Sequence, residues 1–473
     1  MSKFPAIRSI SFYLPEGRLG NEELSRCFPD WTSEKLIRKL GIEERPIVAP
    51  NETAADIGIK AAEIMFNEGI CKPEEIDHLI FCTQSPDYFL PSTACVMHHR
   101  LGLPKSAGAF DFNLGCSGYV YGLSICKGLI ETGAAEKILF ITSETYSKYI
   151  NPMDRVNRPL FGDGAACSLI TADSKPNNTN TTPEFLNDNK NNPNPNNSTC
   201  KEHNNNSQPT QITTNLTANT TSASPNATDG SPNATSASPN ATCASPNATS
   251  ASPNTTCGSP NATSASPNTT GGSPNATGAS PNTTGGSPDA MKFPPREFDG
   301  VPYIGEFVFG TDGGGADLLI VEAGGQRLPK SAETGVELPD NKGSIRSKEQ
   351  LFMHGSGIFS FAIDRVPPMV DELLKKSGIP KSEIGAFVFH QANKYMLQRI
   401  CELCDIDKSL YFNNILNRGN TVSSSIPIAI VDAWREGMLR PNSPIMLIGF
   451  GVGLSWAGTI IRLPDHFIPA SNQ

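Results

Sequence analysis

Long apolar runs are missing from this 473-residue chain, since no stretch of about 18 apolar residues occurs in it. The first residues, Met1-Ser-Lys-Phe-Pro-Ala-Ile-Arg, also lack the apolar centre of a secretory signal. Basic residues are few: 38 Lys and Arg stand against 47 Asp and Glu, which gives a net charge of −9 and argues against general nucleic-acid binding. We therefore expect a soluble, cytoplasmic protein that binds neither membranes nor nucleic acids.

Residues 174–302 are poor in apolar side chains and consist mainly of Asn, Thr, Ser, Pro, Ala and Gly. From Ser224 onward a unit beginning Ser-Pro-Asn recurs every seven residues. Proline in each unit blocks a helix, and no position of the repeat is reliably apolar, which excludes a coiled coil. We predict a disordered, low-complexity surface insertion, because nothing in it can bury a core.

The globular remainder contains an internal duplication. The segment that starts Gly69-Ile-Cys-Lys-Pro-Glu-Glu-Ile resembles the segment that starts Gly378-Ile-Pro-Lys-Ser-Glu-Ile. A helix-like stretch precedes each of them, at residues 54–67 and 363–377, and a short apolar strand follows. Helices that alternate with short apolar strands predict mainly parallel sheets covered on both faces, here in two similar α/β halves.

The insertion interrupts what reads as one domain, because apolar strands flank it on both sides. A long loop at the tip of a hairpin is tolerated, since the cost of closing a loop grows slowly with its length. We therefore predict an N-terminal half at 1–173 that ends at 303–330, the insertion at 174–302, and a C-terminal half at 331–473.

Cys116 lies in a corner of small residues, Gly115-Cys-Ser-Gly, between an apolar strand and the amphipathic segment 118–133. At the start of a helix, unpaired N–H groups and the helix dipole favour a thiolate over a thiol. Such a thiolate can attack a carbonyl and hold an acyl group. The alternative is one more buried and inert cysteine.

The second half places His390 and Asn420 at matching positions. His390 follows the apolar run Ala386–Phe389, so it projects from the carboxyl end of a strand, where catalytic groups collect in α/β sheets. Asn420 could cap a helix, but its amide can also donate to a carbonyl oxygen. Two donors from a neutral His Nε2–H and this amide, aimed at one oxygen, would stabilise an enolate. The glycine-rich loop after Gly449 could form an oxyanion hole together with the N–H of Cys116.

Taken together, these segments resemble β-ketoacyl-acyl carrier protein synthase III of the thiolase superfamily. The resemblance implies a duplicated five-layered α-β-α-β-α sandwich, a homodimer, and an acyltransferase (EC 2.3.1) that needs no cofactor and no metal. It covers both flanks of the insertion, and the motifs occur in the family's order: Gly41-Ile-Glu-Glu-Arg, Gly115-Cys-Ser-Gly, Phe161-Gly-Asp-Gly, Gly310-Thr-Asp-Gly, His390-Gln-Ala-Asn, Gly419-Asn-Thr and Phe450-Gly-Val-Gly.

The resemblance also implies a role for each site residue. Cys116 would be acylated by an acyl-coenzyme A or an acyl-acyl carrier protein. His390 and Asn420 would bind the thioester carbonyl of malonyl-acyl carrier protein and stabilise the enolate formed as carbon dioxide leaves. The N–H groups of Cys116 and Val452 would hold the oxyanion. The product would be a β-ketoacyl-acyl carrier protein of fatty-acid biosynthesis.

Several positions depart from the family's pattern around the expected substrate channel. Lys35 stands where many members have a tryptophan that stacks on the coenzyme A adenine, and Lys39 replaces an arginine that contacts the coenzyme. After Asn393, the last residue of the histidine motif, the family often has an arginine that contacts carrier protein. Tyr395 stands at that position here, with Lys394 beside it. A carrier-protein donor for the acyl group stays open. Our candidates for substrate binding are Lys35, Lys39, Leu90, Asn393 and Lys394.

Leu90 falls where the family commonly has a phenylalanine that enters the partner subunit's acyl pocket. Our hypothesis is that the smaller side chain admits a longer or branched acyl group.

Three other functions fit part of the pattern. One is 3-hydroxy-3-methylglutaryl-coenzyme A synthase, for which Glu52 would have to act as general base. Another is acyl transfer without decarboxylation, or a ketosynthase of a specialised pathway, with the same Cys116, His390 and Asn420. The last is a catalytically silent scaffold that displays the repeat, against which the three intact site residues argue.

Overall fold

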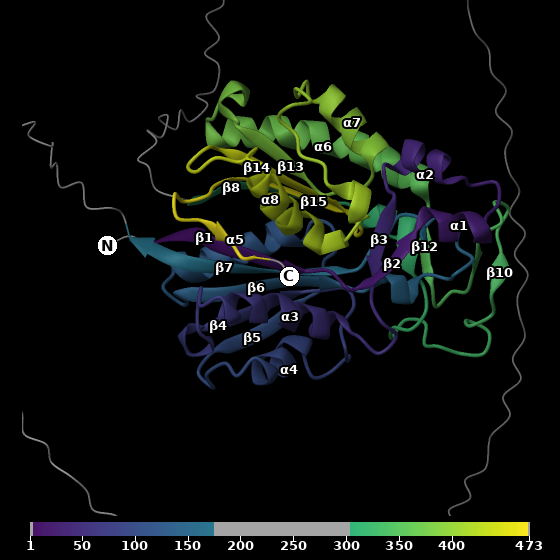
Figure 1. Ribbon diagram of the computed structural model, residues 1–473, viewed down its shortest axis with the longest axis horizontal. Coiled ribbons are helices and arrows are strands. Elements are labelled where there is room, and N and C mark those ends of the chain that lie inside the picture. Colours follow the sequence, from purple (N-terminus) through teal and green to yellow (C-terminus); the bar gives the residue numbers. More distant parts are fainter. Residues whose placement is uncertain (1–2, 175–302, 472–473) are drawn as a thin grey trace, which may run out of the picture. The chain divides into compact units, whose positions relative to one another are not determined.

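The computed structural model describes residues 3–174 and 303–471, which belong to one compact unit of the chain (Figure 1). The predicted disordered insertion at 174–302 lies, apart from residue 174, outside the described residues. Two sheets and the helices around them make up the described unit. Within it, no helix is long and apolar enough to pass through a membrane.

The first sheet has six strands in the order β16-β1-β7-β6-β4-β5. Strands β4, β5 and β6 run parallel to one another, whereas β7 is antiparallel to both β6 and β1. Their bounds are β1 Lys3–Tyr13, β4 His78–Cys82, β5 Gly108–Phe112, β6 Lys137–Glu144, β7 Gly164–Ser174 and β16 Ile468–Pro469.

The second sheet repeats the plan of the first with four strands in the order β13-β14-β15-β8. β13 pairs parallel with β14, as β4 does with β6, and β15 is antiparallel to both of its neighbours, as β7 is. The predicted duplication of the two halves is confirmed by this match. The bounds are β8 Tyr303–Thr311, β13 Ala386–Phe389, β14 Ile445–Gly451 and β15 Ser455–Arg462.

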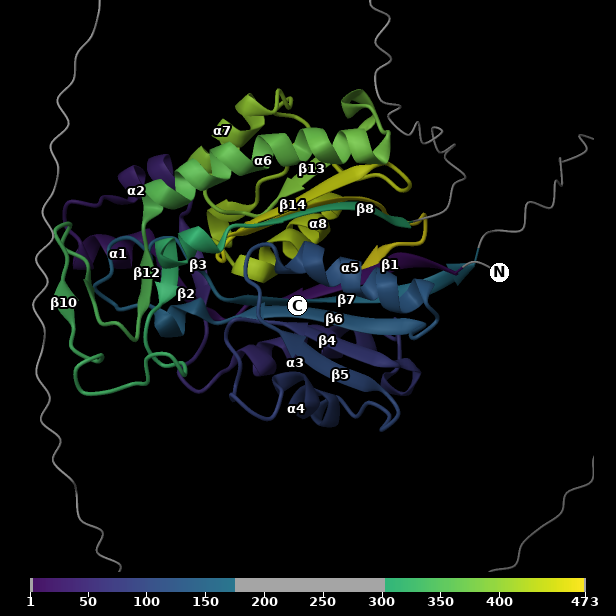
Figure 2. The same ribbon diagram turned by 180° about the vertical axis from the view of Figure 1, so that it is seen from behind.

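Six helices complete five layers, which are visible from both sides in Figures 1 and 2. Two cover the outer face of the first sheet, two lie between the sheets and contact both, and two cover the outer face of the second sheet. The α-β-α-β-α sandwich predicted from the sequence is therefore confirmed. In that order the helices are α3 Ala54–Asn67 and α4 Thr93–Arg100, α5 Gly118–Glu131 and α8 Ser425–Arg435, and α6 Gly355–Ser377 and α7 Lys394–Leu403.

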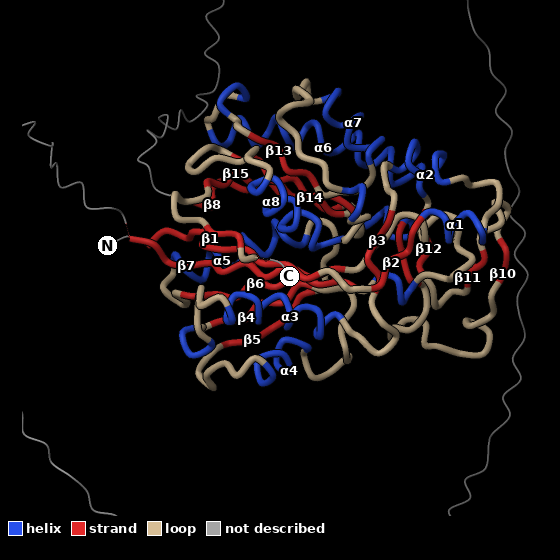
Figure 3. Tube along the Cα trace, in the orientation of Figure 1, coloured by secondary structure: helices blue, strands red, loops and turns tan. Residues whose placement is uncertain are grey.

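Smaller elements gather beside the sandwich, at the side where α2 and β12 are labelled (Figure 3). They comprise two short helices and three two-stranded ribbons, and six 3₁₀ turns lie in connections elsewhere along the described residues. The helices are α1 Asn21–Cys27 and α2 Ser33–Leu40, and the ribbons are β2 Gly17–Gly20 with β3 Glu44–Ile47, β9 Leu319–Val321 with β12 Leu351–Met353, and β10 Leu338–Pro339 with β11 Ile345–Arg346. The turns are η1 Pro73–Glu75, η2 Tyr146–Tyr149, η3 Gly313–Leu318, η4 Lys381–Glu383, η5 Ile415–Asn417 and η6 Val422–Ser424.

Helix α5 can lie between two sheets because apolar and small side chains surround it on most sides. Tyr119, Val120 and Leu123 are fully buried in the core shared by both sheets. Gly122 faces the ring of Phe140 on β6 so closely that an added Cβ would lie 2.0 Å from it. The helix that follows Cys116 is thus fixed against the sheet, and the position of the cysteine with it.

The assignment of residues 303–330 to the N-terminal half is wrong. Strand β8 pairs with β15 of the second sheet, and the ribbon of β9 and β12 spans the predicted boundary at 330/331. The insertion therefore follows the last long strand of one sheet and precedes the first strand of the other, and it does not sit at a hairpin tip. An apolar strand carries no local mark of the sheet it joins, because that choice depends on its distant partner.

Candidate active site

One cavity of about 220 Å³ brings together the three residues on which the sequence analysis depends. Cys116, His390 and Asn420 all line it. They come from the turn after β5, the end of β13 and the loop before η6, so the strand ends of both halves meet there. Only 2–5 % of the surface of each residue is exposed. The cavity is thus a site formed jointly by the two halves.

His390 and Asn420 present their nitrogen atoms side by side. Asn420 Nδ2 lies 3.4 Å from His390 Nε2, while His390 Nδ1 lies 2.7 Å from the Ser425 hydroxyl. The Ser425 hydroxyl lies 2.8 Å from the Val422 carbonyl as well, and its single hydrogen can go to that carbonyl or to Nδ1. When the hydroxyl donates to Nδ1, the ring hydrogen is on Nε2, and this is the tautomer in which His390 and Asn420 both present an N–H to the cavity.

The orientation of the Asn420 amide is fixed by its own loop. Its Oδ1 accepts the Val422 N–H at 2.9 Å, which turns the NH₂ group toward His390. Its backbone pairs with the segment around Phe161 of the first half, through Asn420 N to Leu160 O at 3.0 Å. Helix α8 begins five residues later, after Ser424, so Asn420 is not its cap.

The loop after β14 approaches the sulfur of Cys116 from the second half. A Cβ built on Gly451 would lie 2.8 Å from both Cβ and Sγ of Cys116, so only glycine allows this approach. The backbone N–H groups of Val452 and of Cys116 itself favour the anionic form of the sulfur and lower the pKa of the thiol, against the larger effect of burial. They are the two donors that the sequence analysis assigned to the oxyanion hole, and that assignment stays a prediction.

The protonation states differ from the sequence expectation for the cysteine. Burial raises the pKa of the Cys116 thiol to about 12, and the charge of Glu144 adds to this rise, although the N–H groups of Val452 and Cys116 oppose it. Helix α5 begins only at Gly118, and desolvation outweighs its dipole. Burial also lowers the pKa of His390 to about 3. At neutral pH the unloaded site therefore holds a thiol beside a neutral imidazole, and the expected thiolate is not its resting form.

Trp31 is a lining residue that the sequence analysis missed. It precedes α2, and the ammonium groups of Lys35 and Lys39 lie 5.7 and 5.6 Å from the centre of its ring. The two predicted lysines thus gather around an aromatic residue one turn before the position where the family's tryptophan was expected. The signal in the sequence was the spacing of four residues from Trp31 to Lys35, which places both on one side of a helical start.

The remaining predicted binding residues divide into two groups. Asn393 lines the cavity and also caps α7 by accepting the Met396 N–H at 2.9 Å. Lys394 follows it at the start of α7 and packs so closely on Gly41 that an added Cβ there would lie 2.5 Å away. Leu90 is 83 % exposed on a separate loop and does not line the cavity.

Phe450 was quoted in a motif but not assigned to the site. Its ring lies edge-on to His390, with centroids 5.6 Å apart and planes at 84°, and it lines the same cavity. It shields the imidazole from water, which agrees with the low pKa of that group.

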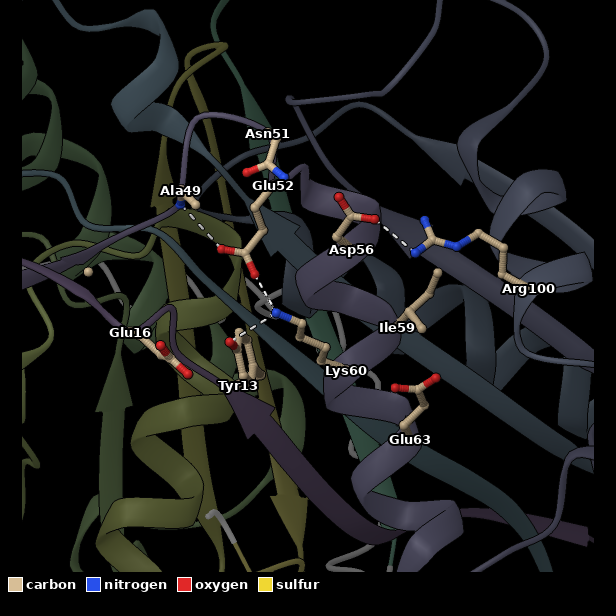
Figure 4. Close-up of a pocket in the computed structure, with 11 residues that line it drawn as sticks. Tyr13, Glu16, Ala49, Asn51, Glu52, Asp56, Ile59, Lys60, Glu63 and Arg100 are labelled. Carbon is tan, nitrogen blue, oxygen red and sulfur yellow. Dashed lines mark hydrogen bonds and ion pairs between the residues drawn. The ribbon is translucent and has the colours of Figure 1, made fainter.

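A second cavity, of about 500 Å³, shares no lining residue with the first (Figure 4). Its cationic groups are already paired: Lys60 with Glu52 at 2.5 Å, and Arg100 with Asp56 at 2.8 Å. Glu52, the base required by the synthase of 3-hydroxy-3-methylglutaryl-coenzyme A, lies here and not beside Cys116. Among the residues that the structure describes, no cluster of His, Cys, Asp and Glu side chains could hold a metal ion.

Comparisons with known proteins agree with this geometry. Two sequence profiles match, 3-Oxoacyl-[acyl-carrier-protein (ACP)] synthase III at residues 110–186 and its C-terminal region at 374–463. A crystal structure of a 3-oxoacyl-(acyl-carrier-protein) synthase III is 34% identical, covers 97% of this chain and 100% of its own, and has a TM-score of 0.70. The chain belongs to the 3-oxoacyl-(acyl-carrier-protein) synthase III family.

Other relatives extend the family match over nearly the whole chain. The beta-ketoacyl-[acyl-carrier-protein] synthase III of Caldanaerobacter subterraneus is 25% identical over 450 residues, which is 95% of either chain. That of Chlamydia caviae is 26% identical over 457 residues, 97% of this chain and 96% of its own. The synthase from Burkholderia xenovorans shares the fold at 24% identity, with a TM-score of 0.65 over 98% of this chain and 95% of its own. This synthase III family is a family of acyltransferases.

Proposed function

We propose that the chain catalyses a decarboxylative condensation between an acyl group on Cys116 and malonyl-acyl carrier protein. The observation that carries the proposal is the single cavity lined by Cys116, His390 and Asn420. A nucleophile alone could serve many acyl transfers, but two neutral donors aimed at one oxygen suit an enolate in particular. We place the reaction in the cytoplasm.

In the first half-reaction Cys116 Sγ attacks the carbonyl of an acyl thioester. The tetrahedral oxyanion accepts hydrogen bonds from the N–H groups of Cys116 and Val452 and then collapses. The acyl group stays on Cys116, and the donor thiol leaves with the proton that the cysteine has lost. Because burial raises the pKa of Cys116 to about 12, the sulfur that attacks is a strong nucleophile once that proton is gone.

In the second half-reaction the malonyl thioester loses carbon dioxide. The electron pair of the broken C–C bond forms an enolate, whose oxygen is held by His390 Nε2–H and Asn420 Nδ2–H. The enolate carbon attacks the acyl-Cys116 carbonyl, and the Cys116 sulfur leaves and takes up a proton from water. The product is a β-ketoacyl thioester on the carrier. A neutral His390, with its pKa lowered to about 3, keeps its role as donor over the whole working range of pH.

Basic side chains around the cavity suit an anionic carrier of the thioester. Lys35 and Lys39 of α2 hold their ammonium groups over the ring of Trp31, and Lys394 begins the neighbouring α7. They support either coenzyme A or an acyl carrier protein as donor, and we keep both as candidates.

We also propose that the enzyme works as a homodimer. β5 is the last strand of its sheet in the described structure, and Phe89 and Leu90 are 84 % and 83 % exposed on a loop that precedes it. An open strand edge beside exposed apolar side chains favours pairing with another chain. Phe89→Asp should shift the sedimentation coefficient to that of a monomer, whereas Leu338→Asp, at an exposed apolar residue of β10, should not. A wild-type monomer would contradict the proposal.

The acyl chain length is tested by mass measurement of Cys116 after incubation with acetyl, octanoyl and longer thioesters. If Leu90 of a partner opens the pocket, the longer groups load at least as well as acetyl. Strict preference for acetyl would refute that hypothesis.

The reaction itself is tested by release of labelled carbon dioxide from malonyl-acyl carrier protein. His390→Ala and Asn420→Ala should each lower the release by about 10²–10³-fold while Cys116 still becomes acylated. His98→Ala, on the outer helix α4, is the matched control. Acylation without any carbon dioxide release in the wild type would support acyl transfer without condensation. Absence of acylation by every thioester would support a silent scaffold.

A further inference from the structure

Glu144 is a fully buried carboxyl group that the proposed mechanism does not use. It is the last residue of β6, and its exposed fraction is 0%. Three donors point at it: Gln84 N–H at 3.0 Å and the Ser85 hydroxyl at 3.2 Å, both to Oε2, and the Ser423 hydroxyl at 2.9 Å to Oε1. A buried carboxyl group with donors on both oxygen atoms is fixed in orientation.

Two of these donors belong to the first half of the molecule, but Ser423 belongs to the second. It lies in η6, three residues after Asn420, and its bond to Glu144 spans 279 positions of the chain. The Glu144–Ser423 bond therefore joins the strand of one half to the loop that presents the catalytic amide of the other.

That loop holds a backbone conformation that requires support. Val422 has φ of +54°, which a β-branched residue rarely adopts and which costs about 1–3 kcal/mol. Each of the three serines that follow makes a different bond: Ser423 to Glu144, Ser424 to the Gly164 carbonyl at 3.0 Å, and Ser425 to the Val422 carbonyl at 2.8 Å and to His390. Of these, only Ser423 bonds a titratable side chain of the first half.

Glu144 is also within electrostatic reach of the nucleophile, since its charge contributes to the raised pKa of Cys116. The other titratable groups around it are Cys82, Tyr146, Tyr149 and Asp163, none of them cationic. In the described chain no lysine or arginine forms an ion pair with it. Among the described residues, its polar contacts are thus the Gln84 N–H and the two serine hydroxyls, and ion pairing does not explain its presence.

We propose that Glu144 is a positioning residue for the condensation, and that its carboxyl group acts through the Ser423 hydroxyl to hold Asn420 in place opposite Cys116. The proposal rests on the proposed function. It predicts that the enolate step depends on this bond, whereas acylation of Cys116, which uses the N–H groups of Cys116 and Val452, depends on it much less.

The test compares two rates, acylation of Cys116 and release of carbon dioxide from malonyl-acyl carrier protein. Ser423→Ala should lower the release about tenfold or more and change acylation less than about threefold, because misplacing a catalytic group by about 1 Å costs up to 10²-fold. Ser85→Ala removes a hydroxyl from the same carboxyl group without touching the loop, so the ratio of its two rates should stay at the wild-type value. Glu144→Gln can still bond Ser423, with the serine as acceptor, and should restore most of the ratio that Glu144→Ala loses.

The outcomes distinguish a failure of the role of Glu144 from a failure of the proposed condensation. An unchanged ratio in Ser423→Ala would overturn the role of Glu144, and so would an equal loss of both rates, which would indicate general damage to the fold. Absence of carbon dioxide release in the wild type would overturn the proposed function itself.

Discussion

Cys116 should react slowly with a neutral alkylating agent at neutral pH, and its rate should keep rising with pH. Burial raises the pKa of its thiol to about 12, so at pH 7.5 only about 3 in 100,000 molecules carry the thiolate. About one in ten molecules of free cysteine, with a pKa of about 8.5, are thiolate at that pH. The difference in thiolate population is about 3,000-fold.

Reactivity differs less than population does, because a more basic thiolate is a better nucleophile. With a Brønsted slope of about 0.4–0.5, the difference of about 3.5 pKa units makes the Cys116 thiolate about 40-fold more reactive than the thiolate of free cysteine. We therefore expect Cys116 to be alkylated about 10²-fold more slowly than free N-acetylcysteine at pH 7.5, before any loss from restricted access.

The assay follows iodoacetamide addition to each cysteine by peptide mass spectrometry between pH 6.5 and 10. Cys116→Ser assigns the adduct, and N-acetylcysteine is the reference in each tube. The Cys116 rate should increase about tenfold per pH unit over the whole range. A plateau reached by pH 8 would show a thiolate in the resting enzyme and refute the dominance of burial at this site.

Three further predictions concern Gly451, Glu144 and Trp31. Gly451→Ala should reduce the rate of Cys116 acylation at least about tenfold, because the added Cβ would lie 2.8 Å from Sγ. Gly128→Ala is the control and should leave the rate unchanged, because nothing lies within 4 Å of its added Cβ. Equal acylation rates in the two variants would be inconsistent with the close approach of Gly451. Burial raises the pKa of Glu144 from 4.5 to about 8, so between these values the folded state keeps a proton that the unfolded state loses. The free energy of unfolding should therefore fall by about 1.4 kcal/mol per pH unit as the pH rises from about 5 to 8. Glu144→Gln removes that slope, and parallel melting-temperature profiles of variant and wild type over this range would contradict it. Trp31→Ala should raise the KM for an acyl-coenzyme A several-fold. The KM for an N-acetylcysteamine thioester should rise less, because this substrate lacks the nucleotide. An equal rise in both KM values would argue against a role for the Trp31 ring in holding the donor.

The sequence was a good guide wherever the signal was local. The resemblance between the segments at Gly69 and Gly378 led to two matching halves, and the strands β4 and β13 that follow them do occupy equivalent places in the two sheets. It was a poor guide at β8, whose apolar alternation suits either sheet. Pairing with β15 determines that β8 joins the second sheet, and β15 lies about 150 residues further along the chain.

The site shows the same division. Cys116, His390 and Asn420 were identified from short motifs, because each lies at a strand end or a small-residue corner that is visible in the sequence. Glu144 was not identified, because nothing around it in the sequence marks a functional group. Its importance comes from burial and from a bond to Ser423 in the other half.

The sequence by itself therefore determined the fold class, the duplication and the identity of the three candidate catalytic residues, since periodicity and motifs are properties of neighbouring residues. Only the tertiary structure decided which sheet β8 joins, that Trp31 borders the cavity, and that Cys116 rests as a thiol. These depend on desolvation and on contacts between residues far apart in the chain, and both arise only when the two halves pack together.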